Sequence, residues 1–164
     1  MRKSEARVGL GELLERGGIY YALPGNSVRE TIEALVAIIP VQPAIPGQNL
    51  LQAVLEREAL MSTSIGQGIA VPHPRNPMAV KQEEQFAALA FLKHPVDWNA
   101  LDGKPVDTLI LIVSSTAKFH LRILSSITFF CREEAFLRLL KERAKQEALI
   151  GFIKDTERKW EAES

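Results

Sequence analysis

Two hydrophobic runs in the sequence stay apolar at nearly every position. They are QFAALAFL, residues 85–92, and TLILIV, residues 108–113. Because successive side chains of a strand point to opposite faces, an uninterrupted apolar run predicts a strand that is buried on both faces. The alanine and leucine content of the first run leaves a helix open as the alternative. Two shorter segments, 19–23 and 69–71, predict further strands.

Helical periodicity and its stop signals predict two helices in the first part of the chain. A short helix over residues 10–16 ends at Gly17-Gly18. A second helix begins after Ser27, and Glu30 is placed to complete a capping box. Pro40 and Pro43 stop this helix. Its apolar face consists of Ile32, Leu35, Val36 and Ile39.

Three more helical segments follow the same logic. The spacing predicts a helix capped by Asn49 and ending at Leu60, another over about 118–131, and one or two helices over 133–154. We expect a polar loop over 93–106, which contains Trp98, and a frayed tail over 157–164. The core-facing residues of the helix that ends at Leu60 are expected to be Leu51, Val54, Leu55 and Ala59.

Strands separated by helices predict an α/β fold with a mixed, mostly buried β-sheet and helices on both faces. No repeat or low-complexity linker divides the chain, so residues 1–164 are expected to form a single domain with a core over about 9–154.

Composition narrows the function classes. Formal net charge is +0, which gives no global field for nucleic acid or an anionic membrane. The one cysteine, Cys131, excludes an internal disulfide framework and any multi-cysteine metal site, and its helical position indicates a small core residue. No apolar stretch has the form of a secretory signal or approaches the ~20 residues of a membrane span. We therefore expect a cytoplasmic protein.

His73 is the first candidate for chemistry. It follows the predicted strand 69–71 and lies between Pro72 and Pro74. Pro72 fixes its own φ, and Pro74 holds the backbone of His73 in an extended conformation. A fixed imidazole suits nucleophilic or acid–base chemistry, in which a misplacement of ~1 Å can cost ~100-fold in rate. The alternative is a surface histidine in a proline-rich turn.

His120 and Arg57 are further candidates. His120 is expected one turn into a helix, on its inward side, where free N–H groups and the helix dipole favour an anion. The alternative is a histidine at the edge of the core with its hydrogen bonds satisfied. Arg57 precedes the loop STSIGQG and suits phosphate binding, although it is equally suited to stabilising the end of its own helix. His94 lies in the predicted loop and is expected at the surface. No HExxH-type spacing supports zinc binding by the three histidines.

The segment EREAL, residues 56–60, and the segment STSIGQGIAVPH, residues 62–73, resemble the enzyme IIA domain of the bacterial phosphotransferase system, fructose/mannitol type. The segment DGKPVD, residues 102–107, is a second match, and it is followed by an apolar strand and a histidine at a helix start. The likeness covers about residues 9–154.

The resemblance implies a mechanism. His73 would be the phosphorylated nucleophile, His120 would stabilise the phosphoryl group, and Arg57 would bind phosphate. A histidine phosphocarrier protein (HPr-like) would be the phosphoryl donor. Ser62, Thr63, Gly66, Gln67 and Gly68 would contribute to phosphate binding. No metal, nucleotide or other cofactor is required.

The resemblance leaves the subtype open. A stand-alone chain with this N-terminal extension is more similar to the nitrogen-regulatory branch, which acts by phosphorylation-dependent binding to target proteins. A sugar-specific component that passes the phosphoryl group to a IIB component is the alternative. Three residues depart from the family pattern at positions where glycine is common, which are Met61, Ser64 and Pro74.

Two other functions stay possible on the residues alone. One is a non-catalytic binding module, since the apolar side chains of Met61, Ile65 and Ile69 near an anionic centre suit a protein interface. The other is a metal hydrolase that uses the histidines.

Overall fold

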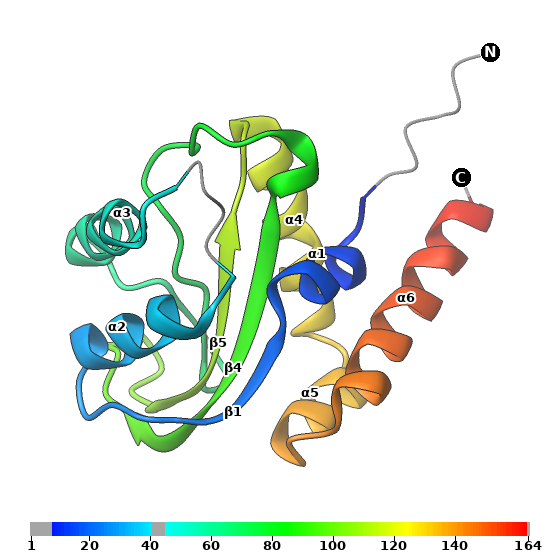
Figure 1. The fold of residues 1–164 in the computed structure, drawn as a ribbon. Helices are drawn as coiled ribbons and strands as arrows, with labels where there is room; N and C mark the ends of the chain where they lie inside the picture. The colour runs from blue at the N-terminus through cyan, green and yellow to red at the C-terminus, as the bar shows by residue number, and fades with distance from the viewer. Residues whose placement is uncertain (1–7, 41–44, 164) are drawn as a thin grey trace.

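A mixed five-stranded sheet separates two layers of helices (Figure 1). The computed structural model describes residues 8–40 and 45–163. The strands run in the order β1-β4-β5-β3-β2; β1 pairs with β4 and β3 with β5 in parallel, whereas β4–β5 and β2–β3 are antiparallel. Their bounds are β1 Ile19–Leu23, β2 Ser64–Gly66, β3 Ile69–Ala70, β4 Phe86–Val96 and β5 Val106–Val113.

The helices divide between the two faces of the sheet, as predicted. Helices α1, α4, α5 and α6 pack on one face with one buried cluster, and α2 and α3 pack on the other with a second cluster (Figure 1). None of the helices in the described ranges is long and apolar enough to cross a membrane. The bounds are α1 Leu10–Gly17, α2 Val28–Ile38, α3 Gly47–Leu60, α4 Ala117–Phe130, α5 Glu134–Lys141 and α6 Gln146–Glu163, with a 3₁₀ turn at Gln82–Glu84.

Strand β4 settles the ambiguity of the first apolar run. Leu89 and Phe91 belong to the cluster under α1 and α4, whereas Ala88 and Ala90 belong to the cluster under α2 and α3. The side chains alternate between two buried faces, so every position must be apolar. Alanine suits the α2–α3 side because its small side chain leaves room for the helices.

Two glycines let α1 lie against β4. Gly17 is the last residue of α1, and a Cβ atom built on it would lie 1.9 Å from the carbonyl oxygen of Ala87. Gly18 has a φ of 95°, and its carbonyl accepts the N–H of Leu89 at 3.1 Å. The predicted stop signal therefore also marks a close contact between backbones.

The predicted helix starts need two corrections. The Ser27 hydroxyl accepts the N–H of Glu30 as expected, but the Glu30 carboxylate accepts the N–H of Asn26. Helix α3 begins at Gly47, so Asn49 lies inside its first turn instead of capping it. The carbonyl of Pro46 accepts the first helical bonds there. Pro43 lies outside the described residues.

The core face of α3 is also narrower than predicted. Val54 is buried, as expected, and so is Leu50, which the sequence analysis left out. Leu51 and Leu55 are half-buried, and Ala59 is exposed. An α-helix turns about 100° per residue, so an earlier start at Gly47 does not change which side chains of α3 share a face. Packing against α2 decides that Leu50 and Val54 are the buried ones.

The predicted polar loop over 93–106 is shorter than expected. Strand β4 continues to Val96, beyond a shift in its register with β5 after Phe91. Trp98 is only 2% exposed and belongs to the cluster under α2 and α3. Lys93, His94 and Pro95 are exposed one after another before the buried Val96, and an exposed run that contains a proline resembles a loop in the sequence.

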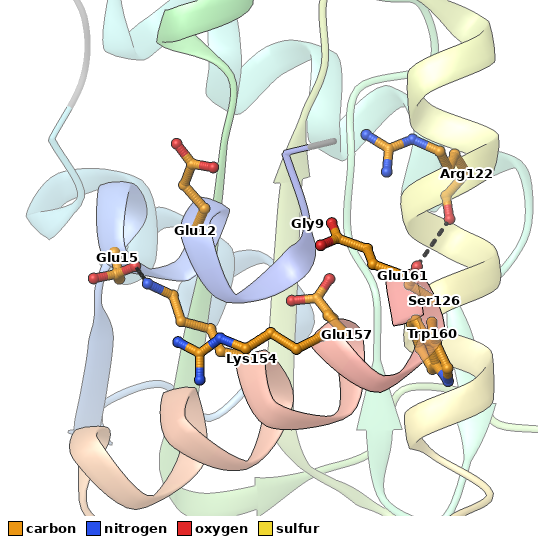
Figure 2. Close-up of a pocket in the computed structure, with 10 residues that line it drawn as sticks. Gly9, Glu12, Glu15, Arg122, Ser126, Lys154, Glu157, Trp160 and Glu161 are labelled. Atoms are coloured by element: carbon orange, nitrogen blue, oxygen red, sulfur yellow. Dashed lines mark hydrogen bonds and ion pairs between the residues drawn. The ribbon is translucent and has the colours of Figure 1, made fainter. Parts of the chain in front are cut away.

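The C-terminal segment is helical where we expected fraying, because α6 continues to Glu163. Figure 2 shows the Glu157 side chain near the first turn of α1, where its carboxylate accepts the N–H groups of Leu10 at 2.9 Å and Gly11 at 3.1 Å. The Trp160 ring lies 4.7 Å from the Phe129 ring, measured between centroids. Contacts with distant parts of the chain thus stabilise the helical conformation of this segment, which its own polar sequence does not predict.

Candidate functional site

The sheet and helix α4 bring His73 and His120 together. Val71 belongs to the buried cluster that also contains residues of α4. Side chains two residues apart in an extended chain share a face, so His73 points toward α4 as Val71 does. The two imidazole rings lie with their centroids 4.6 Å apart at an interplanar angle of 45°. His73 is 9% exposed, so it is a buried residue and not part of a surface turn.

Hydrogen bonds on two sides hold the backbone before His73. The N–H of Val71 donates to the carbonyl of Thr63 at 3.0 Å, and the N–H of Ile112 donates to the carbonyl of Pro72 at 3.2 Å. Together with the flanking prolines, these bonds leave the backbone of His73 few alternatives.

The ring of His73 has a defined orientation. Its Nδ1 atom lies 2.7 Å from the carbonyl oxygen of Val71. A carbonyl oxygen only accepts hydrogen bonds, so Nδ1 carries the proton. In the neutral ring, Nε2 then holds the lone pair and is the nucleophilic nitrogen.

The surroundings keep His73 neutral. Burial lowers the pKa of His73, and the positive charge of Arg57 lowers it further. The bond to the Val71 carbonyl and the charge of Glu58 act in the opposite direction and are outweighed. At neutral pH the ring is therefore an available nucleophile.

His120 lies in the first turn of α4. Thr116 caps this helix, since its hydroxyl accepts the N–H of Phe119 at 3.1 Å. Burial lowers the pKa of His120 to about 4, and the charges of His73 and Arg57 contribute in the same direction. A neutral His120 can donate one hydrogen bond to an anion held by the helix N-terminus.

Arg57 lies in the last turn of α3. Its guanidinium group donates to the carbonyl of Met61 at 2.7 Å, which supports the end of the helix as one of the two sequence-based interpretations suggested. Its charge also affects the pKa of both His73 and His120. One guanidinium bond goes to the helix, and the remaining N–H groups stay available for an anion.

Glu58 fixes the start of the loop and was not singled out from the sequence. Its carboxylate accepts both the N–H and the hydroxyl of Thr63, at 2.7 and 2.6 Å. The hydroxyl of Ser62 donates to the carbonyl of Trp98 at 2.5 Å. The two hydroxyl groups are thus committed within the protein, and the backbone of Thr63 borders the segment that carries His73.

The glycines of the loop form a hairpin turn between β2 and β3. Gln67 and Gly68 have φ values of 59° and 76°, the positive sign that a type I′ turn requires. The N–H of Gln67 donates to the carboxylate of Asp102 at 3.2 Å. His73 is five residues beyond Gly68, and an extended path of that length measures about 16 Å at ~3.3 Å per residue. The structure therefore places Gly66, Gln67 and Gly68 at the far end of the hairpin from the histidines.

The three departures from the family pattern fit without strain. Met61 has a φ of −166°, an extended conformation that needs no glycine, and its side chain is 71% exposed. The hydroxyl of Ser64 donates to the carbonyl of Ile69, and Pro74 is buried beside His73.

The apolar docking surface predicted at Met61, Ile65 and Ile69 is only partly exposed. Ile65 is exposed, as an interface requires, but Ile69 is a core residue. The expectation that Ile69 belongs to an apolar docking surface is therefore wrong.

The third histidine stands apart from the site. His94 is exposed, as expected, but it lies on β4 instead of in a loop. Within residues 8–40 and 45–163, no group of three or more His, Cys, Asp or Glu side chains could hold a metal ion. Cys131 is buried, as predicted, and burial raises its pKa to about 12, so its thiol is not reactive near neutral pH.

A family model described as "Phosphoenolpyruvate-dependent sugar phosphotransferase system, EIIA 2" matches residues 12–156. The chain belongs to this family. The "Nitrogen regulatory protein" of Escherichia coli K12 is 28% identical to this EIIA protein over 162 residues, which cover 96% of each chain. The fructose-specific EIIABC component of Bacillus subtilis is 28% identical over 145 residues, covering 87% of this chain and 22% of that protein.

Solved structures of EIIA proteins share the fold. The nitrogen regulatory protein IIA-Ntr of Neisseria meningitidis superposes with a TM-score of 0.75 at 26% identity, over 87% of this chain and 97% of that chain. The mannitol IIA of Escherichia coli has a TM-score of 0.56 at 20% identity, over 74% of this chain and 85% of that chain, and supports the fold alone.

Proposed function

We propose that this EIIA protein is a phosphohistidine carrier, in which Nε2 of His73 accepts a phosphoryl group from a histidine phosphocarrier protein. The bond between Nδ1 of His73 and the Val71 carbonyl carries the proposal, because it leaves Nε2 as the free nucleophile. The neighbouring ring of His120, 4.6 Å away between centroids, supports a role beside the phosphoryl group. The family match is consistent with this chemistry.

The transfer needs no proton movement at His73. The N–P bond of the donor histidine breaks as a bond forms between phosphorus and Nε2 of His73, and the donor histidine leaves as a neutral ring. The ring of His73 then carries a positive charge, and Nδ1 keeps its proton and still donates it to the Val71 carbonyl. That hydrogen bond favours the charged ring, as its upward effect on the pKa of His73 indicates.

The other residues of the site have supporting roles in this proposal. Arg57 and His120 stabilise the phosphoryl oxygens by charge and hydrogen bonding. Ser62 and Thr63 hold the backbone beside the segment that carries His73. The hairpin turn at Gly66, Gln67 and Gly68 has no direct role at the phosphate in this proposal, because it lies at the other end of the hairpin.

Nitrogen or metabolic regulation is the favoured role. The alignment with the nitrogen regulatory protein of Escherichia coli covers 96% of both chains. In this role, the added dianion changes which target proteins bind at the exposed side chains around the site, such as Met61 and Leu121. The cytoplasm is the compartment in which such carriers and targets would meet.

A sugar-specific role is the second candidate. The fructose-specific EIIABC component of Bacillus subtilis is 28% identical to this chain, the same identity as that of the nitrogen regulatory protein of Escherichia coli. A solved complex pairs the mannitol IIA of Escherichia coli with phosphorylated IIB, and the fold match to it has a TM-score of 0.63 at 17% identity. In this candidate, phosphorylated His73 passes its phosphoryl group to a IIB component.

Intact mass spectrometry tests the carrier function directly. We expect the protein to gain one phosphoryl group when it is incubated with phosphorylated carrier protein, and to lose it in acid but not in alkali. His73→Ala should abolish the gain, whereas the matched control His94→Ala should not change it. The proposal is contradicted if His73→Ala still gains a phosphoryl group, or if the wild-type protein gains none.

A second assay separates the two roles. Transfer from the phosphorylated protein to purified IIB components, followed by autoradiography, indicates a sugar-specific role. A regulatory role is indicated if no transfer to IIB occurs and if pull-downs with the phosphorylated and unphosphorylated protein recover different sets of bound proteins.

A further inference from the structure

A small cavity of about 70 Å³ lies beside His120, on the side of the loop that follows His73. Its wall includes Pro74 and Arg75 of that loop, Ser114 at the end of β5, and Ala117 and His120 of α4. His120 thus belongs both to the histidine pair and to the cavity wall, so the two are contiguous.

Ser114 gives the cavity wall a polar group whose hydrogen-bonding capacity is unused. Ser114 is 4% exposed, and its Oγ atom has no hydrogen-bond partner among residues 8–40 and 45–163. The backbone of Ser114 is fixed, because its carbonyl accepts the N–H of Met78 at 2.9 Å. A buried hydroxyl without a partner destabilises the fold, and a ligand oxygen in the cavity would remove that penalty.

Hydrogen-bond donors of the first turn of α4 and of Arg75 lie in or next to the cavity wall. Thr116 caps the N–H of Phe119, and the N–H groups of Ala117 and Lys118 lie ahead of the helical ladder at the positive end of the α4 dipole. The guanidinium of Arg75 is exposed and has no ion pair with any residue in the described ranges.

No acidic residue of the described chain lines the cavity, so its charge is positive. The neutral His120 ring adds a group that donates with one nitrogen. These features together match an oxyanion: a residue with a hydroxyl, a residue with a guanidinium group and the first residue of a helix border a space of the size of one small tetrahedral ion.

We infer that the cavity lined by Ser114, Arg75 and the first turn of α4 is an oxyanion subsite beside the histidine pair. The oxyanion has two possible sources, the phosphoryl group on His73 and free inorganic phosphate. The first source rests on the proposed carrier function, and the second does not. In both cases Ser114 and Arg75 act as ligands that the sequence analysis did not single out.

Titration of the ¹⁵N-labelled protein with inorganic phosphate tests the subsite. We expect saturable shifts of the Ala117 and Lys118 amide signals. Ser114→Ala and Arg75→Gln should each weaken phosphate binding about 10-fold or more, the loss of one hydrogen bond to a charged group. The matched controls are Ser125→Ala on the exposed side of α4 and Arg132→Gln beyond its other end, which should bind phosphate as the wild type does. Shifts that do not saturate, or an equal weakening in the controls, overturn the inference.

Two further arms identify the source of the oxyanion. If the phosphoryl group occupies the subsite, phosphorylation shifts the same two amide signals and prevents phosphate binding, and Arg75→Gln shortens the lifetime of the phosphorylated protein. If the ligand is free phosphate, the phosphorylated protein still binds it with unchanged affinity.

The arms also separate this inference from the proposed function. Saturable phosphate binding to a protein that never accepts a phosphoryl group supports the subsite and rejects the carrier function. A protein that is phosphorylated on His73 but binds no phosphate, with a lifetime that Ser114→Ala and Arg75→Gln leave unchanged, rejects the subsite alone.

Discussion

His73 and His120 share one charge environment, because their rings lie 4.6 Å apart and Arg57 affects the pKa of both. Neither ring can gain a proton without an electrostatic cost from the other. The pair therefore stays neutral at a pH where a solvated histidine is partly charged. This shared neutrality is the property that a phosphoryl acceptor requires.

Removing the charge of Arg57 should raise the pKa of both histidines. Arg57→Gln takes away a positive charge that disfavours the protonated rings, while burial keeps both pKa values below the ordinary range. An NMR titration of the imidazole signals measures the change. Arg132→Gln, an exposed arginine beyond the end of α4, serves as the control. Unchanged histidine pKa values in Arg57→Gln would remove Arg57 from the electrostatics of the site.

The stability of the protein should fall as the pH is lowered from about 6.5 to about 4. The pKa of His120 is about 4 in the folded protein and ~6.5 in the unfolded chain, so only the unfolded chain binds a proton there over most of this range. The slope from this residue is less than about 1.4 kcal/mol per pH unit, because its partial exposure weakens the effect.

Urea denaturation at several pH values measures that slope. His120→Asn should flatten the decline of the free energy of unfolding, and the exposed His94→Asn should leave it as it is. A decline of equal slope in the wild type and His120→Asn would show that other groups cause it.

Phosphorylation of His73 should raise the pKa of His120. The phosphoryl group adds a negative charge of about 1.5 to 2 beside a ring whose low pKa comes mainly from burial. A protonated His120 would then pair with the phosphoryl oxygens. Comparing the His120 titration in the two states checks this, and an unchanged or lower pKa would place the phosphoryl group away from His120.

Gly17 and Gly151 should respond oppositely to alanine. A Cβ atom at Gly17 would lie 1.9 Å from the backbone oxygen of Ala87, so Gly17→Ala should destabilise the protein by roughly 2–3 kcal/mol. Gly151 lies inside α6 with nothing within 4 Å of an added Cβ, so Gly151→Ala should stabilise it by about 0.5–1 kcal/mol. Thermal unfolding of the two variants gives the comparison. Equal effects of the two changes would contradict the close contact of α1 with β4.

Glu157→Ala should destabilise the protein by about 1–2 kcal/mol, because the N–H groups of Leu10 and Gly11 lose the carboxylate that caps them. The exposed Glu163→Ala, in the same helix, is the matched control. A chain that ends at residue 156 should lose more stability, since it also lacks Trp160. Urea denaturation measures all three, and no loss in the shortened chain would support the frayed tail that the sequence suggested.

The local pattern of the sequence determined the parts of the fold that depend on neighbouring residues. Strands β4 and β5 were predictable because burial on both faces demands an apolar residue at every position. The extended backbone of His73 was predictable because two prolines restrict it from both sides. The motif around His73 also carried the resemblance to the enzyme IIA family, which the family match bears out.

Only the tertiary structure decided the relations between distant segments. It placed His120 against His73 and set the hairpin glycines at the far end from the histidines. It also left the hydroxyl of Ser114 near the pair without a partner in the described part of the chain. It also ordered the polar segment that ends α6, through contacts with Leu10 and Phe129. Strand pairing and helix packing are set by long-range contacts, and the spacing of residues along the chain carries little information about those contacts.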